Sequence, residues 1–364
     1  MSADPLRVGL IGYGLAGRSF HAPLVAATPG LRLAAVVTRD AERRAQAARE
    51  HPAAALVGTA DALWALGDRL DVVVIAAPNR AHVPLATAAL EAGLAVVVDK
   101  PLAATAADGR RLLEAARRHG RLLTVFQNRR WDGDFLTVRR LVADGALGAV
   151  HRFESRFERW RPVPKPGWRE RAAPEEAGGV LYDLGSHLVD QALCLFGPVA
   201  RVYAELDRRR PGAAVEDDAF VALEHASGVR SHLWMSAVAA QPGPRFRVLG
   251  SRAAYVKHGL DGQEARLRAG ERPPAPAAAG AGAPADDWGV EPRERWGTLG
   301  AEGAVAPVET ARGDWRRFYA GLVAALRAGA PPPVDPADAV AGLAVLEAAR
   351  RSAAGGGAVS LPTV

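Results

Sequence analysis

Short apolar runs alternate with amphipathic segments along the first third of the chain. The apolar runs cover residues 7–12, 31–38, 71–78, 95–99 and 122–127. Runs of this length and composition are typical of strands that are buried on both faces of a parallel sheet. Between them, residues 80–93 and 106–120 have helical spacing and end at a glycine, as many helices do. The alternation predicts a doubly wound α/β domain with a parallel sheet over residues 1–126.

From about residue 128 the pattern changes to an alternation of apolar and polar residues. It covers residues 151–160, 201–209, 220–225 and 230–238. An apolar residue at every second position predicts half-buried strands, mostly antiparallel, with one face toward solvent. Helices are predicted over residues 180–196, 314–328 and 336–353. We therefore expect a second, α+β domain over residues 127–364, with a large open sheet for substrate binding and oligomerisation, and C-terminal helices that can pack back on the first domain.

Other features of the chain place it in a broad class. Residues 271–287 are a tract of Pro, Ala and Gly that cannot form a core, which predicts a surface loop. No apolar run reaches the roughly 18 residues that a membrane span needs, and the N-terminus enters a strand without a signal peptide. A net charge of +6, with 24% charged and 49% hydrophobic residues, is ordinary for a globular protein and does not indicate nucleic-acid binding. We expect a cytoplasmic protein.

The single cysteine, Cys194, excludes a disulfide framework and a cysteine metal cluster. It lies in an apolar helical pattern, so we expect a small core residue there. No metal site is predicted.

A glycine motif of the form G-x-G-x-x-G follows the first predicted strand. Gly12 allows a tight turn, Gly14 allows a pyrophosphate to approach the backbone, and Gly17 allows the helix and the strand to pack closely. The pyrophosphate would lie at the helix N-terminus, where free N–H groups favour an anion. The motif predicts a dinucleotide cofactor in contact with Gly12, Tyr13, Gly14, Leu15, Ala16 and Gly17.

The end of the second predicted strand bears on which dinucleotide binds. NAD sites usually have an acidic residue about 20 positions beyond the glycines. Here Thr38 and Arg39 precede the first acid, Asp40. A hydroxyl and a guanidinium suit a 2′-phosphate, so NADP is favoured, with NAD as the alternative. Arg39 could instead be a solvated residue and Asp40 a helix N-cap.

The apolar run at residues 71–78 ends at the expected position of the ligand crevice. Pro78, Asn79 and His82 follow there and are candidate contacts of a nicotinamide. Asn79 could instead cap the next helix, and His82 could be an ordinary surface residue.

Lysine is rare in this chain, which makes one lysine informative. Of 46 basic residues only Lys100, Lys165 and Lys257 are lysines. Lys100 lies between the run at residues 95–99 and Pro101, at the carboxyl edge of the predicted sheet. A desolvated lysine can release a proton near neutral pH, whereas an arginine cannot. Lys100 is therefore a candidate to hold a substrate hydroxyl and relay a proton, although a strand-end lysine kept by chance is the alternative.

Asp183 and His187 are four residues apart in the helix predicted over residues 180–196. This spacing places them on one face, where the carboxylate could hydrogen-bond the imidazole. Such a bond would fix the tautomer and raise the basicity of His187, which makes it a candidate general base. A zinc site is not favoured, because no further ligands are evident.

Several segments together resemble one oxidoreductase family. GYGLAG after a strand, DKP at 99–101 and GGVLYDLGSHLVDQ at 178–191 resemble the family of glucose–fructose oxidoreductase and inositol 2-dehydrogenase, Gfo/Idh/MocA, over nearly the whole chain. FQNRRWDGDF at 126–135, RFERWRP at 156–162 and GLDGQEARLRAG at 259–270 are similar to its NADP-dependent scyllo-inositol dehydrogenase-like branch. The usual E-K-P of the family is D-K-P here, so Asp99 is one methylene shorter.

The resemblance implies hydride transfer between NAD(P) and a secondary hydroxyl of a cyclic polyol or sugar. It also implies that Lys100, Asp183 and His187 form the catalytic set. Polar and aromatic side chains that could bind a hydroxyl-rich ring, or could simply pack the sheet surface, are Asn128, Arg129, Trp131, Arg161 and Trp168.

Two other functions and an assembly state are also considered. An NAD-retaining glycosidase or lyase is disfavoured by Thr38 and Arg39, and a non-catalytic dinucleotide-binding regulator by the intact Lys100, Asp183 and His187.

An apolar or aromatic face on the second sheet would commonly be buried between subunits, so we expect a homodimer or homotetramer.

Overall fold

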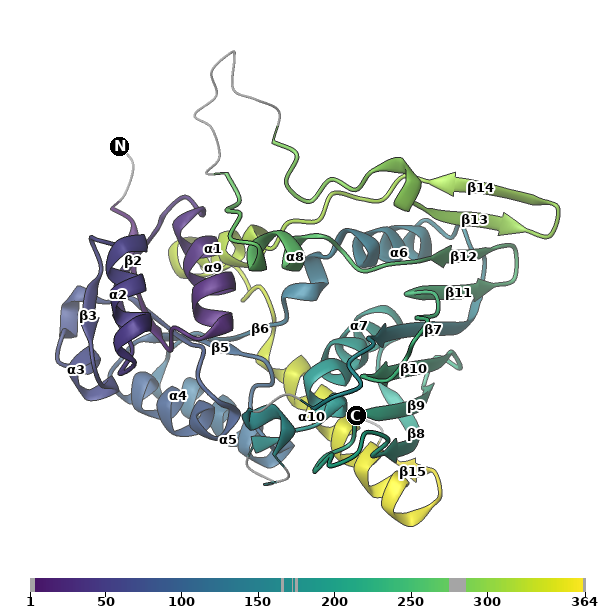
Figure 1. Ribbon diagram of the computed structural model, residues 1–364, viewed down its shortest axis with the longest axis horizontal. Coiled ribbons are helices and arrows are strands. Elements are labelled where there is room, and N and C mark those ends of the chain that lie inside the picture. The colour runs from purple at the N-terminus through teal and green to yellow at the C-terminus, as the bar shows by residue number, and fades with distance from the viewer. Residues whose placement is uncertain (1–3, 165–166, 172, 174–175, 275–285, 363–364) are drawn as a thin grey trace.

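The computed structural model describes residues 4–164, 167–171, 173, 176–274 and 286–362. Two sheets form its framework, one in the N-terminal third and one in the rest of the chain (Figure 1). This arrangement confirms the predicted fold class. Of the tract at 271–287, residues 275–285 lie outside the described part.

The first sheet has six strands in the order β3-β2-β1-β4-β5-β6, and all adjacent pairs are parallel. The strands are β1 Leu6–Ile11, β2 Leu31–Val37, β3 Ala55–Val57, β4 Val72–Ile75, β5 Ala95–Asp99 and β6 Leu123–Phe126. The apolar runs predicted five of them. β3 was not predicted, because its three half-buried residues are too few to make a pattern. The strand order reverses between β1 and β4, and a ligand crevice forms at that point of an open parallel sheet.

Helices connect successive strands of the first sheet. They are η1 Gly17–His21, α1 Ala22–Ala26, α2 Ala41–Glu50, α3 Ala60–Trp64, η2 Gly67–Arg69, η3 Asn79–Ala81, α4 His82–Glu91 and α5 Ala106–His119. Capping residues at both ends of α5 explain where this helix begins and stops. The Thr105 side chain accepts a hydrogen bond from the Asp108 N–H, and Gly120 ends the helix in the left-handed conformation, with φ 61°.

The second sheet has nine strands in the order β14-β13-β12-β11-β7-β10-β9-β8-β15. They are β7 Val150–Glu158, β8 Val199–Asp207, β9 Asp218–His225, β10 Arg230–Ser236, β11 Phe246–Gly250, β12 Ala254–Lys257, β13 Gly297–Ala301, β14 Ala304–Val308 and β15 Val359–Ser360. All its pairs are antiparallel except β7 with β10. The alternating pattern predicted β7 to β10. The other five strands are short and were not predicted.

The helices of this part are η4 Asn128–Trp131, α6 Gly133–Ala143, η5 Trp168–Glu170, η7 Leu181–Gly185, α7 Ser186–Phe196, α8 Gln263–Arg268, η8 Arg293–Arg295, α9 Arg316–Ala328 and α10 Pro336–Gly355. α7 packs against β7 and β10. Cys194 on α7 is exposed, so the expectation of a core cysteine is wrong.

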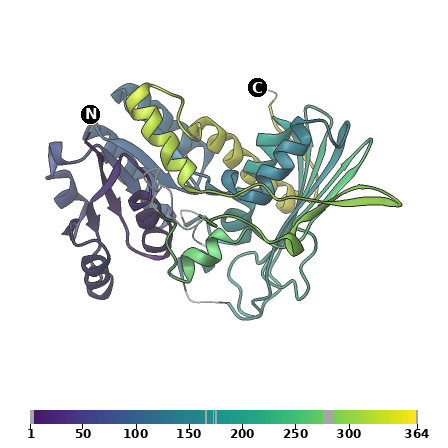
Figure 2. The same ribbon diagram turned by 90° about the horizontal axis from the view of Figure 1, so that it is seen from above.

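The last two helices pack against both sheet regions (Figure 2). α9 contacts α1, while α10 contacts α5 and β6 on one side and β8 on the other. Close contact with α5 depends on Gly109, where a Cβ would lie 2.9 Å from Val340 Cγ2. The buried Thr124 hydroxyl of β6 also donates to the Val334 carbonyl at 2.8 Å. Among the described residues, no helix combines the length and the apolar content that crossing a membrane requires.

Candidate active site

The glycine turn between β1 and η1 has the shape that a dinucleotide needs. Gly12 has a φ of 96°, and a Cβ at Gly12 or Gly17 would overlap a backbone carbonyl oxygen, of Ala76 or of Gly12 itself. At Gly14, by contrast, the nearest atom to such a Cβ is an Arg43 guanidinium nitrogen at 3.9 Å. Two glycines therefore let the chain pack, and the third leaves an open backbone surface that fits a pyrophosphate.

The other residues of the turn have different surroundings. Tyr13 is 1% exposed, and its hydroxyl donates to Glu50 of α2 at 2.6 Å, so it braces the turn from behind. Leu15 and Ala16 instead line a cavity beside the turn, and Leu15 is 38% exposed. They are the residues of the turn that a cofactor could cover.

The end of β2 and the start of α2 present one guanidinium group each. Arg39 is exposed and donates to the Gly58 carbonyl at 3.3 Å, while Thr38 is buried. Asp40 caps α2 by accepting from the Arg43 N–H at 2.9 Å, as its alternative interpretation proposed. Arg43, one helical turn after Arg39, extends toward Gly14. It was not predicted, although its spacing from Arg39 was a usable signal.

After β4, the side chains of Asn79 and His82 contact backbone carbonyls of other segments. The Asn79 amide is buried and donates to the Glu176 carbonyl at 2.8 Å, and it does not cap η3. His82 is 1% exposed, with Nδ1 2.8 Å from the Pro101 carbonyl oxygen and Nε2 2.9 Å from that of Ala77. The ring is buried between two backbone carbonyl oxygens, so His82 is not a surface residue. Pro78 directly precedes η3.

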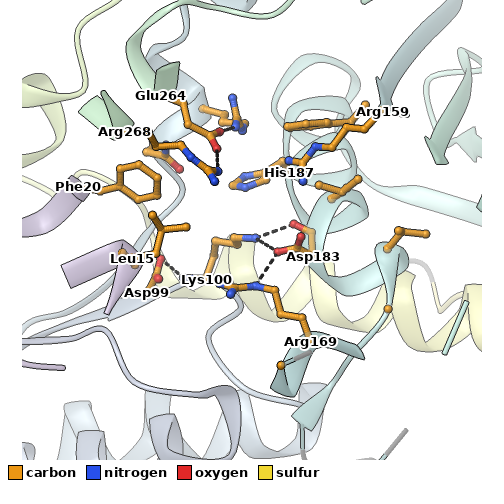
Figure 3. A pocket seen from close by; sticks show the side chains of 18 of the residues that line it. Leu15, Phe20, Asp99, Lys100, Arg159, Arg169, Asp183, His187, Glu264 and Arg268 are labelled. Atoms are coloured by element: carbon orange, nitrogen blue, oxygen red, sulfur yellow. Dashed lines mark hydrogen bonds and ion pairs between the residues drawn. The ribbon is translucent and has the colours of Figure 1, made fainter. Parts of the chain in front are cut away.

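Lys100 extends from the carboxyl end of β5 into the cavity (Figure 3). Its Nζ donates to the Asp183 carbonyl oxygen at 2.6 Å and lies 3.3 Å from Asp183 Oδ1. The side chain is 13% exposed, and this burial lowers the pKa of Lys100 below its ordinary value, although Asp183 opposes the shift. Its ammonium therefore releases a proton more readily than that of a surface lysine.

Asp183 binds cations rather than the histidine. Oδ1 accepts from Arg169 Nε at 3.2 Å as well as from Lys100. Burial by itself would raise the pKa of Asp183, but Lys100 and then Arg169 hold it below its usual range. The expected hydrogen bond to His187 is not formed. Residues 181–185 form the π-helical turn η7, which has more residues per turn than an α-helix and so shifts Asp183 off the expected face.

His187, in the first turn of α7, faces the same cavity and is 6% exposed. Its Nδ1 is buried and has no hydrogen-bond partner among the described residues. Burial, and then the charges of Lys100 and Arg129, lower the pKa of His187 well below the ordinary histidine value. The expectation that a carboxylate raises its basicity is therefore wrong, and His187 is neutral at neutral pH.

These residues surround a cavity of about 320 Å³ between the two sheets. The glycine turn lies on one side, Lys100 at the base, and η7 and α7 opposite. Of the predicted substrate contacts, Asn128, Arg129 and Arg161 line it. Trp131 does not, because its ring packs on Phe318, with centroids 5.8 Å apart. Trp168 lies in η5, and its side chain is outside the described part of the structure.

A dinucleotide cradle at the edge of a parallel sheet, opening on side chains that can move a proton, defines the class of nicotinamide-dependent oxidoreductases. Within that class the chain belongs to the Gfo/Idh/MocA family. The family's sequence models match residues 6–127, as an oxidoreductase family with an NAD-binding Rossmann fold, and residues 135–256, as the GFO/IDH/MocA C-terminal domain. The resemblance seen in the motifs is thus confirmed.

Individual relatives span almost the entire chain. The oxidoreductase YdgJ of Escherichia coli (strain K12) is 41% identical, covering 96% of this chain and 97% of its own length. The scyllo-inositol 2-dehydrogenase (NADP⁺) IolW of Bacillus subtilis (strain 168) is 32% identical, covering 96% and 94%. The solved structure of the oxidoreductase YvaA from Bacillus subtilis has a TM-score of 0.91 and 31% identity, and the match covers all of both chains.

Proposed function

We propose that this oxidoreductase transfers a hydride between NADP and a secondary hydroxyl of a polyol or sugar, with Lys100 and His187 handling the hydroxyl proton. The observation that carries the proposal is the meeting of Lys100 from β5 with Asp183 and His187 from η7 and α7, in one cavity beside the glycine turn. The similarity to an enzyme named for scyllo-inositol supports a hydroxyl-rich substrate.

Each residue then has a distinct role in alcohol oxidation. A bound nicotinamide would supply the acceptor for the hydride of the carbinol carbon. Lys100 donates a hydrogen bond to the hydroxyl oxygen, and Asp183 holds the ammonium in place. His187, being neutral, has a free lone pair with which to accept the hydroxyl proton. In the reverse direction the same groups return a proton to the developing alkoxide.

The cofactor in this proposal is NADP, because two basic side chains lie near the expected adenosine ribose. Arg39 is exposed at the end of β2, and Arg43 extends toward the open face of Gly14. Guanidinium groups bind phosphate oxygens strongly and in a defined geometry. The first carboxylate after β2, that of Asp40, caps α2 and so is engaged by the helix backbone.

A substrate screen tests the proposal directly. Inositols, pyranoses and small 2-keto acids are incubated with the protein and either NADP or NAD, and reduction or oxidation of the nicotinamide is followed by absorbance. Turnover of a polyol or sugar with NADP supports the proposal. Tightly retained cofactor with substrate conversion but no net reduction would instead indicate a glycosidase or lyase. Cofactor binding without any turnover would indicate a regulator.

We also propose that the protein is a homodimer or homotetramer assembled through the outer face of the second sheet. Phe220 and Trp234 lie there with ring centroids 5.1 Å apart, and Tyr203 is 37% exposed. α7 packs against β7 and β10 on the opposite face of the sheet, and these aromatic side chains lie on the face away from it. Aromatic groups in such a position are commonly buried between subunits.

A further inference from the structure

The charged side chains of the cavity are not evenly compensated. Seven arginines and lysines line it, against five carboxylates. Five of the basic residues form ion pairs: Lys100 and Arg169 with Asp183, Arg129 with Asp132 and Glu264, Arg210 with Asp217 and Glu170, and Arg268 with Glu264. The remaining two, Arg159 and Arg161, pair with none of the carboxylates that the structure describes.

Arg159 and Arg161 are held side by side directly after β7. Their backbone N–H groups donate to the Ser236 and Ala237 carbonyls at 2.8 and 2.7 Å, which keeps this segment extended. In an extended chain, alternate side chains share one side. Both arginines therefore turn toward the cavity, while Trp160 between them is 57% exposed. The backbone thus fixes two like charges at one wall.

The guanidinium of Arg159 is oriented by its neighbours. It lies over the Phe157 ring, with Cζ 4.7 Å from the centroid. Figure 3 shows it pointing toward His187, on the side away from Leu15 and Phe20 of the glycine-turn region. Burial lowers the pKa of Arg159 to about 10; Asp183 opposes this shift and Arg161 adds to it. A positive charge in these surroundings is costly unless an anion joins it.

We propose that the substrate of this oxidoreductase is an anionic sugar or polyol, whose carboxylate or phosphate binds Arg159 and Arg161. The inference rests on the proposed function. The cofactor's pyrophosphate belongs at the glycine turn, on the opposite side of the cavity, so the anion at these arginines comes from the substrate. The planar fork of a guanidinium matches the paired oxygens of either group.

The chemistry at the carbinol is unchanged by this addition. The carbinol hydrogen would leave with the bonding electron pair as a hydride, for which a bound nicotinamide would be the acceptor, and the O–H proton would pass to His187, leaving a ketone. The anionic group takes no part in these steps. It fixes which hydroxyl of the substrate lies between Lys100 and His187.

The test compares sugars that share a ring and differ in charge. kcat/KM is measured with NADP for glucose, glucuronate and glucose 6-phosphate, and for galactose, galacturonate and galactose 6-phosphate. We expect an anionic member to exceed its neutral counterpart by about 10- to 100-fold, the usual scale of a charge-assisted hydrogen bond. The carboxylate and phosphate arms show which anion is used. Equal or higher kcat/KM for the neutral members of both sets would overturn the inference.

Variants then assign the preference to Arg159. Arg159→Gln should remove the advantage of the anionic sugar, and Arg159→Lys should restore part of it, since an ammonium keeps the charge without the fork. Arg118→Gln, on the exposed surface of α5, makes the same charge change as a control and should leave the ratio intact. A ratio that Arg159→Gln does not change would contradict the assignment.

A binding measurement separates this inference from the proposed function. Calorimetric titration of the NADPH-loaded protein with glucuronate, glucose 6-phosphate and glucose requires no turnover. Tighter binding of an anionic sugar, lost in Arg159→Gln, supports the inference even if the redox proposal fails. Turnover of neutral polyols together with no preference for anionic sugars in binding would leave the redox proposal standing and refute this one.

Discussion

At Lys100, a single ammonium connects the end of β5 to the backbone and side chain of Asp183. Lys100→Arg keeps the charge but cannot relay a proton, and Lys100→Met keeps the approximate volume but removes both charge and donor. We expect each variant to lose about 10²-fold or more in kcat, the scale of a general acid–base group.

Cofactor affinity and thermal unfolding serve as the controls for both Lys100 variants and should change little, because β5 is otherwise unaltered. Near-full activity of Lys100→Arg would show that positive charge alone is required at this position.

The shifted pKa values of His187 and Lys100 predict a pH profile for alcohol oxidation. His187 acts when deprotonated, so kcat/KM rises with pH through its pKa, which lies well below 6.5. Lys100 acts when protonated, so kcat/KM falls as pH passes its pKa, which lies below 10.5. His187→Gln should lack the acidic limb and Lys100→Met the alkaline limb. An acidic limb above pH 6.5 that survives in His187→Gln would rule out His187 as the base.

Arg39 predicts the cofactor preference. A charge-assisted bond to the 2′-phosphate is worth about 1.5–3 kcal/mol, so Arg39→Ala should raise the Kd of NADP by about 10- to 100-fold and that of NAD little. Arg44→Ala is the matched control, because the Arg44 guanidinium donates to the Leu56 carbonyl instead. Fluorescence titration measures both affinities. A change of less than about twofold for NADP would remove Arg39 from the site.

The individual site residues show what a sequence can and cannot predict. Lys100, Asp183 and His187 were identified because a rare residue type and a characteristic spacing marked them, and they do meet in one cavity. Their hydrogen bonds were not predictable, because the π-helical turn η7 leaves no trace in the apolar pattern. Arg159 lies in the motif RFERWRP, but the sequence could not show that its guanidinium forms no ion pair with the described carboxylates.

Among the elements, the β1–turn–η1 unit contains one glycine that is needed for packing and another that is expected to be needed for cofactor binding. Gly17→Ala would place a Cβ against the Gly12 carbonyl oxygen, so we expect a loss of about 1–3 kcal/mol in the free energy of unfolding. Gly14→Ala meets only the Arg43 side chain, at 3.9 Å, and should leave stability almost unchanged while weakening cofactor binding. Denaturant unfolding and cofactor titration of the two variants test this. Equal stability in both would show that the turn can relax.

Prediction of the elements succeeded where the apolar pattern is long. The buried runs of β4 and β5 and the alternation of β9 and β10 are strong signals. β13 and β14 gave none, because Gly300 interrupts β13 and β14 (AVAPV) has no polar residue to alternate with. The β13–β14 hairpin joins the sheet through the long-range pairing of β13 with β12. Such strands depend on their neighbours rather than on their own sequence.

For the whole molecule, assembly is the property most open to test. If subunits meet at the outer face of the second sheet, Trp234→Asp should place a charge in the interface and release a monomer near 38 kDa. Val305→Asp is a matched control, since Val305 is 59% exposed and lies on β14, the edge strand far from β9 in the strand order. Sedimentation velocity at micromolar concentration measures the oligomeric state of both variants. A wild-type protein that sediments only as a monomer would refute the assembly.

The position of α10 also affects how the chain folds during synthesis. The N-terminal sheet is translated first, yet β6 and α5 acquire their packing partners, Val334 and Val340, only when the last segment is made. A nascent chain therefore leaves the ribosome with part of its first core uncovered and cannot complete that core until translation is almost finished. A premature stop codon before residue 334 would damage the nucleotide-binding end of the protein as well as its C-terminus, and the truncated product is expected to be degraded by cellular proteases.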